Sequence, residues 1–110
     1  MERVYNKLVR DKIPAIIEGN GETPITKILN ETEYKEELEK KLYEEYKEVI
    51  AANSNERLEE LADMIEVIRA LANLENKSLN DVILIADEKK ENRGAFNDRI
   101  FLEKVMEAIE

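Results

Sequence analysis

The sequence predicts an all-α protein whose centre is an antiparallel hairpin of two long helices. The composition favours helix, because charged residues make up 39% and apolar residues 43% of the 110 positions, with three glycines and two prolines. Apolar residues recur at spacings of three and four between Leu38 and Leu74, the period of amphipathic helices. The polar break "NSNE" at 53–56 divides this periodic region in two.

A short helix is predicted in the N-terminal segment "RDKIPAIIEGNG". Asp11 lies near its start, Pro14 falls in its first turn, and Gly19 or Gly21 ends it. The following "TPITKIL" is β-branched and comes after a turn, so we expect a short strand or extended segment near residues 25–29.

The two long helices have recognisable starts and ends. Asn30 and Glu33 have capping-box spacing, which begins the first helix, and this helix should continue to about Ala52. The second follows the break at 53–56 and should end near Asn76. Because the connection is short, the helices are predicted to be antiparallel neighbours.

The last part of the chain predicts a third helix and an ambiguous tail. Ser78 and Asp81 should cap a helix that ends at Gly94. Residues 99–102 of the tail could pair with 25–29 as strands, or the whole tail could be helical. We expect one domain over 1–110. The second long helix is apolar nearly all round between Met64 and Leu74, so a second chain should complete a four-helix-type bundle.

Composition also limits the function. Without cysteine or histidine, disulfides, thiolate or imidazole metal sites and histidine-based catalysis are excluded. A net charge of −9 argues against a nucleic-acid partner. The charged N-terminus is unlike a signal peptide and no segment is long and apolar enough to span a membrane, so we expect a cytoplasmic protein without a membrane partner.

Four acids occupy unexpected places on the two long helices. Glu45 falls inside the apolar stripe of the first helix and Glu48 lies at its edge. Glu60 and Asp63 are in file with Val67 on the second helix. Both pairs lie a few residues from the break, so they are predicted to face each other across the hairpin.

Facing carboxylates need an explanation, because two unit charges about 5 Å apart repel by roughly 3 kcal/mol at an effective dielectric of about 20. Some could be protonated, basic side chains could interleave, or a cation could bind. An all-oxygen donor set suits a hard ion such as Mg²⁺ or Mn²⁺. The alternative is ordinary, because E-x-x-E spacings arise easily in a glutamate-rich chain and usually mark solvated faces paired with lysine.

Four blocks of the sequence resemble, in order, a small MazG-like protein. This is the all-α nucleoside triphosphate pyrophosphohydrolase superfamily, which includes the phosphoribosyl-ATP pyrophosphohydrolases. The resemblance covers most of the chain, and its first and last blocks are more specific than the acid spacing. The blocks are "YNKLVRDKIPAIIE" (5–18), "KLYEEYKEVIAA" (41–52), "EELADMIEVIRAL" (59–71) and "KKENRGAFNDRIFL" (89–102).

The resemblance implies particular roles for residues. The family motif, E-E-x-x-E on one helix and E-x-x-D on the next, maps onto Glu44, Glu45, Glu48, Glu60 and Asp63. It implies Mg²⁺, or Mn²⁺, held by Glu45, Glu48, Glu60 and Asp63, with Glu44 or Glu45 accepting a proton as water attacks between the α and β phosphates. The products would be a nucleoside monophosphate and pyrophosphate. Cations for the phosphates would come from Arg10, Lys12, Lys41, Lys89, Lys90 and Arg93.

The basic residues also have simpler explanations. Lys89, Lys90 and Arg93 lie where basic side chains favour the helix dipole, and Lys41 could simply pair with Glu45. Arg10 and Lys12 could make surface ion pairs.

The last block departs from the family pattern. Asn92 stands where the family commonly has glutamate, and Ala95 replaces the second of two glycines. The Tyr-His of histidine-pathway enzymes is absent, so a free, non-canonical nucleotide is favoured over phosphoribosyl-ATP. A non-catalytic helical dimerisation module is the second hypothesis.

Overall fold

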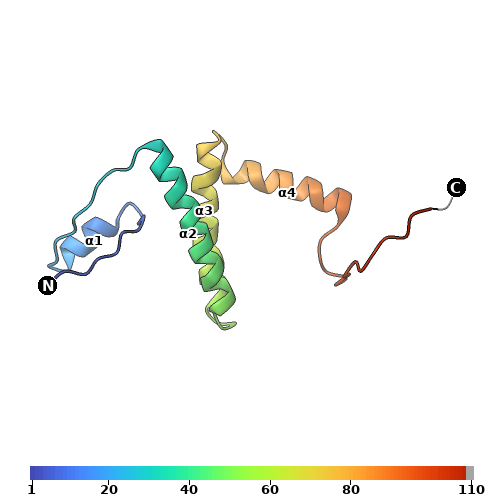
Figure 1. Cartoon of the computed structure of the whole chain (residues 1–110), viewed down its shortest axis with the longest axis horizontal. Helices are drawn as coiled ribbons and strands as arrows, with labels where there is room; N and C mark the ends of the chain where they lie inside the picture. The colour runs from blue at the N-terminus through green and yellow to red at the C-terminus, as the bar shows by residue number, and fades with distance from the viewer. Residues whose placement is uncertain (109–110) are drawn as a thin grey trace. The chain divides into compact units, whose positions relative to one another are not determined.

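The computed structural model describes residues 1–108 and divides the chain into two compact units, Met1–Leu79 and Asn80–Glu110. The first unit holds α1 (Ile13–Gly19), α2 (Glu31–Ala51) and α3 (Arg57–Leu74) (Figure 1). The fourth helix, α4 (Leu79–Arg93), starts at the last residue of the first unit and otherwise belongs to the second. No strand forms within residues 1–108. The predicted all-α class is therefore confirmed.

The start of α2 follows the predicted capping box. The Asn30 side chain accepts from the Glu33 backbone N–H at 2.9 Å, and the Asn30 N–H donates to the Glu33 carboxylate at 3.4 Å. Two otherwise unpaired N–H groups are thereby satisfied at the first turn. The helix then runs without glycine or proline to Ala51, one residue short of the predicted end.

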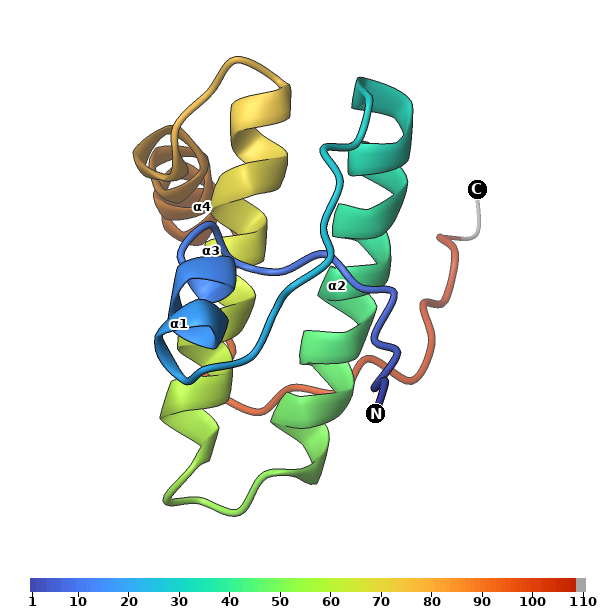
Figure 2. The ribbon, with the colours of Figure 1, turned by 90° about the vertical axis from the view of Figure 1, so that its left-hand side faces the viewer.

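The connection between α2 and α3 is organised by Asn53. Its side-chain oxygen accepts from the backbone N–H groups of Asn55 and Glu56, at 3.1 and 3.2 Å, and its backbone carbonyl accepts from Arg57 at 3.0 Å. This tight turn reverses the chain, so α2 and α3 pack side by side as the predicted antiparallel hairpin (Figure 2). At its other end α3 stops before Asn76, which adopts a left-handed φ of 59°.

The hydrophobic core of the hairpin is small. Among residues 1–108, the buried side chains are Leu38 on α2 and Val67 and Ala72 on α3, at 3%, 7% and 8% exposure. Large apolar side chains remain exposed on both helices, among them Tyr43, Ile50, Leu58 and Ile65. This packing is consistent with part of a helical bundle, and one copy of the chain leaves much apolar surface in water.

Short α1 lies apart from the hairpin. In the first unit, whose residues are all described, α2 and α3 are the helix pair whose backbones come close. The N-terminal segment before α1 runs across α2, and an irregular connection leads from α1 to the start of α2 (Figures 1 and 2). Residues 25–29, predicted as a possible extended segment, lie in this connection and pair with no strand within residues 1–108.

The second unit contains α4 and an irregular tail. Its helix begins directly after Ser78 and ends before Gly94, whose φ is 85°, as the sequence predicts. Residues 94–108 are neither helix nor strand, so neither interpretation of the tail holds for its described part; 109–110 lie outside the described residues. None of the helices within 1–108 has the length and apolar character needed to cross a bilayer.

Candidate metal centre

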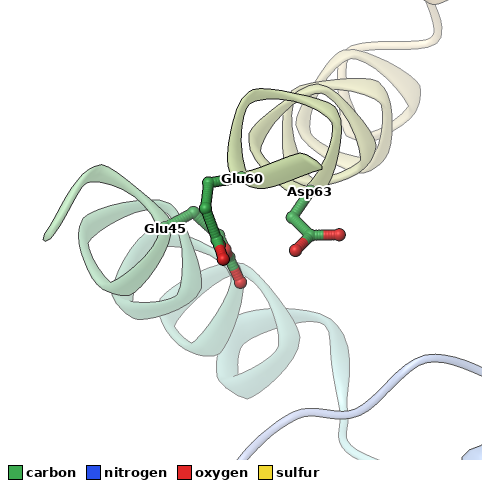
Figure 3. Close-up of side chains that lie close together, drawn as sticks. All are labelled: Glu45, Glu60 and Asp63. Atoms are coloured by element: carbon green, nitrogen blue, oxygen red, sulfur yellow. The ribbon is translucent and has the colours of Figure 1, made fainter. Parts of the chain in front are cut away.

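Three carboxylates converge between α2 and α3 (Figure 3). Glu45 comes from α2, while Glu60 and Asp63 come from the first two turns of α3. One oxygen from each side chain lies within 4.8 Å of the other two, and all three residues are half-buried. The short turn at Asn53 sets these positions, since it places residues shortly before and after it at the same level of the hairpin.

Glu45 lies in a strongly acidic environment. Partial burial, which disfavours the charged form, raises its pKa, and the negative charge of Asp63 raises it further. Lys41 opposes this effect, while Glu60 and Glu48 add smaller repulsions. The net result is a pKa above the ordinary glutamate value, so the Glu45 carboxylate has lost favourable solvation and gained repulsion.

The Glu60 carboxyl is affected in the same direction. Loss of hydration and then the charges of Glu48 and Asp63 raise its pKa, with further contributions from Glu56 and Glu59. The pKa of both Glu45 and Glu60 is raised, so nearby basic side chains such as Lys41 do not fully offset the lost hydration and the repulsion at these two carboxyls. A positive charge among these carboxylates would offset both the loss of hydration and the repulsion between them.

The donor set fits a hard divalent cation. Mg²⁺ binds oxygen ligands at about 2.1 Å, so ligand oxygens on one ion are separated by about 3 to 4.2 Å. The observed limit of 4.8 Å is close to this spacing, and rotation of flexible glutamate side chains can close the difference. Three carboxylates leave octahedral positions for water or for phosphate oxygens.

The other two predicted acids are placed differently. Glu48 is exposed and is not among the three whose oxygens approach within 4.8 Å, although its charge contributes to the pKa of both Glu45 and Glu60. The Glu44 carboxylate lies 3.6 Å from the Lys41 ammonium and 4.0 Å from that of Lys7. Lys41 therefore pairs with Glu44, the acid next to the partner expected from sequence.

Arg10 is brought to the acid cluster by the N-terminal segment. Its guanidinium Nη2 donates to Asp63 Oδ1 at 2.7 Å. The resemblance assigns Arg10 to the phosphates, but no sequence pattern pairs it with Asp63, because the two residues are 53 positions apart in the chain. Lys7 is a further basic contact that the sequence does not predict, and its only sequence signal is its place in the same N-terminal block.

Among the remaining basic candidates, Lys12 makes no ion pair with the three acids within the described residues 1–108, and the others belong to the second unit. Lys12 is exposed at the residue before α1. Lys89, Lys90 and Arg93 are exposed on the C-terminal part of α4, where Lys90 and Arg93 favour the helix dipole. Arg93 also borders a hollow lined by residues 93–100 of the second unit.

Tyr43 and Tyr46 form a stacked pair on the exposed side of α2. Their ring centroids are 6.1 Å apart, and the Lys47 ammonium lies 4.9 Å from the centre of the Tyr43 ring. Both rings are more than half exposed, so they are not part of the hairpin core.

Comparison with known proteins yields one partial relative. Over 50 residues the chain is 42% identical to an uncharacterized protein of Mycolicibacterium smegmatis (strain ATCC 700084 / mc(2)155), a match covering 46% of this chain and 51% of that protein. The chain thus spans about half the length of the curated relative it matches. No family model and no solved structure matches the chain.

Proposed function

We propose that the protein is a Mg²⁺-dependent nucleoside triphosphate pyrophosphohydrolase, which converts a nucleotide to its monophosphate and pyrophosphate. The observation that carries the proposal is the convergence of Glu45, Glu60 and Asp63 from two adjacent helices to within 4.8 Å. The resemblance of the E-E-x-x-E and E-x-x-D segments to the MazG-like motif supports it, because the three acids that meet all belong to the five motif acids.

The residues divide naturally between holding a cation and handling a proton. Glu45, Glu60 and Asp63 would hold Mg²⁺ or Mn²⁺, and the resemblance adds Glu48, whose charge raises the pKa of both Glu45 and Glu60. A cation held there would supply positive charge to phosphate oxygens and would make a water molecule more acidic. Glu44, held in place by its two lysine neighbours, would be the proton acceptor beside the ligand set.

Phosphate charge also needs protein cations. Arg10 and Lys41 belong to the first unit and lie at the acids themselves, so they are the nearest candidates. The resemblance also names Lys12, Lys89, Lys90 and Arg93 as candidates for phosphate contact. Without a histidine, the chain lacks the Tyr-His pair of phosphoribosyl-ATP enzymes, and we favour a free, non-canonical nucleotide as substrate in a cytoplasmic house-cleaning role.

The direct test is a panel of canonical and damaged nucleoside triphosphates, incubated with Mg²⁺ or Mn²⁺ and analysed for pyrophosphate and orthophosphate. Pyrophosphate release that depends on the metal is expected for at least one nucleotide. Orthophosphate as the first product would place the cut at the β–γ bond and contradict the proposed reaction. No turnover with any nucleotide would reject the enzymatic proposal.

A matched pair of variants then ties any turnover to the site. Asp63→Asn should lower turnover at least about 100-fold, since even residues that only support metal ligands cost 10- to 100-fold. Asp87→Asn, an exposed aspartate on α4, should leave it unchanged.

Self-association is the second part of the proposal, and a scaffolding module is the competing function. The specific observation is the exposure of large apolar side chains such as Leu58, at 77%, on the helices of the hairpin. A homodimer or higher oligomer would cover them and complete the bundle. A protein that associates through these faces yet neither binds divalent cations nor cleaves nucleotides would be the non-catalytic module.

A further inference from the structure

The N-terminal segment carries two basic side chains onto the acids of the hairpin. Lys7 lies 4.0 Å from Glu44 on α2, and Arg10 donates to Asp63 on α3 at 2.7 Å. The segment therefore bridges both helices, and Figure 2 shows it crossing α2 on its way to α1. Arg3, earlier in the same segment, pairs instead with Glu22 in the connection after α1.

Arg10 and a divalent cation would compete for the same carboxylate, that of Asp63. Asp63 is both the acceptor of the Arg10 hydrogen bond and a member of the three-acid group. A cation coordinated by Asp63 would lie within about 5 Å of a guanidinium hydrogen-bonded to the same side chain. Two positive charges at that distance repel, so each weakens the binding of the other.

The ion pair between Arg10 and Asp63 is exposed and therefore weak. The side chains of Arg10 and Asp63 are 57% and 45% exposed, so water screens their attraction and solvates a released guanidinium. A divalent cation shared by three carboxylates interacts with each of them. We therefore expect the divalent cation to bind Asp63 more strongly than Arg10 does, so that Arg10 is displaced.

We propose that Arg10 is a displaceable counter-ion, which neutralises Asp63 until a divalent cation binds and then turns to the anionic ligand that the cation brings. This inference rests on the proposed metal-dependent function and adds a binding order to it. The Lys7–Glu44 ion pair would keep the segment beside the site, and the planar fork of the released guanidinium suits a phosphate group. Arg10 thus opposes the bare cation and favours the cation with its phosphate ligand.

The test compares binding of Mn²⁺ alone with binding of inorganic pyrophosphate in the presence of Mn²⁺, by calorimetry on the full chain. Arg10→Ala should tighten binding of Mn²⁺ alone about two- to fivefold, the range expected for removal of an exposed ion pair. The same variant should weaken pyrophosphate binding at saturating Mn²⁺ several-fold. Arg10→Lys keeps the charge and should restore most of the competition with Mn²⁺.

Arg3→Ala is the matched control, because it removes an arginine ion pair from the same segment away from the three acids. It should change neither measurement, and circular dichroism should show equal helix content in all variants. A purely structural role for Arg10 predicts weaker binding of both ligands in Arg10→Ala.

Tighter binding of Mn²⁺ together with weaker binding of pyrophosphate in Arg10→Ala is therefore the result that identifies the proposed exchange. Unchanged Mn²⁺ affinity in Arg10→Ala, with clear binding to the unmodified protein, would overturn this inference and leave the proposed function standing. Absence of Mn²⁺ binding to the unmodified protein would overturn both.

Discussion

Glu45 on α2 and Asp63 on α3 approach each other to within 4.8 Å, and the charge of Asp63 is the strongest electrostatic influence that raises the pKa of Glu45. These two carboxylates belong to different helices and come together only because the hairpin closes. Folding therefore has to work against their repulsion unless a cation is present.

Removing one of these charges should stabilise the protein when divalent cations are chelated. Glu45→Gln keeps the shape of the side chain and abolishes its repulsion with Asp63. Because the group is only partly buried and water still screens it, we expect a gain on the order of 0.5 kcal/mol in the free energy of unfolding, measured by urea denaturation in EDTA. Glu39→Gln, an exposed glutamate on the same helix, is the control and should have no effect. A clear loss of stability in Glu45→Gln would show that the carboxylate is held by favourable contacts.

Acidification should have a matching effect. The raised pKa values of Glu45 and Glu60 mean that the folded protein binds protons more tightly than the unfolded chain just above the ordinary glutamate value of 4.5. These groups therefore lower stability as pH rises through that window, and protonation below it removes the cost. Thermal unfolding in EDTA at a series of pH values should show this contribution. It should disappear from the double variant Glu45→Gln/Glu60→Gln, and identical pH profiles for the two proteins would contradict it.

Mg²⁺ should reverse the balance by binding the folded state. At a concentration 100-fold above its dissociation constant, the ion would add about 2.7 kcal/mol to the free energy of unfolding, or about 10 °C in Tm for a chain of this size. The shift should be lost in Asp63→Asn and kept in Asp87→Asn, which lies outside the acid cluster. Equal shifts in both variants would place the bound ion elsewhere.

The capping box should make a measurable contribution of its own. Asn30→Ala removes the acceptor for the Glu33 N–H and leaves the first turn of α2 open. The expected cost is about 1 kcal/mol in the free energy of unfolding, from urea denaturation. Thr32→Ala, in the same turn, serves as the control for a change in helix propensity. A cost no larger than that of the control would mean that the hydrogen bond to the Asn30 side chain adds nothing to stability.

Self-association should depend on the exposed apolar faces of the hairpin. Leu58 and Ile65 are 77% and 44% exposed on α3, and a lysine at either position would place a charge inside any interface that covers them. Sedimentation velocity should show an oligomer for the unmodified protein and a shift toward monomer for Leu58→Lys and Ile65→Lys. Thr32→Lys adds the same charge at the start of α2 and should not change the oligomeric state. A monomeric unmodified protein at about 100 μM would contradict the proposed assembly.

Much of the fold could be predicted from local sequence. The capping box at Asn30, the polar break at Asn53 and the left-handed Gly94 are decided by hydrogen bonds and backbone preferences within a few residues. The approach of Glu45 to Asp63 followed from helix period and one short turn. The contact between Arg10 and Asp63 could not be predicted, since no local rule determines where an irregular N-terminal segment lies.

The apolar residues of 25–29 and 99–102 were a misleading signal. β-branched and aromatic side chains suggest strands, but a strand needs a partner with free backbone groups, and neither segment pairs as a strand within residues 1–108. Most apolar side chains of the two segments are exposed, as are many on the hairpin, while only Leu38, Val67 and Ala72 are buried within the described residues.

The tight turn at Asn53 has a consequence for how quickly the acids come together. Contacts between neighbouring helices joined by so few residues are local, and proteins rich in local contacts reach their transition state rapidly. We therefore expect the hairpin to form early from this turn, which would bring Glu45 to Glu60 and Asp63 at an early stage of folding. Divalent ions should therefore change the refolding rate of the chain as well as its equilibrium stability.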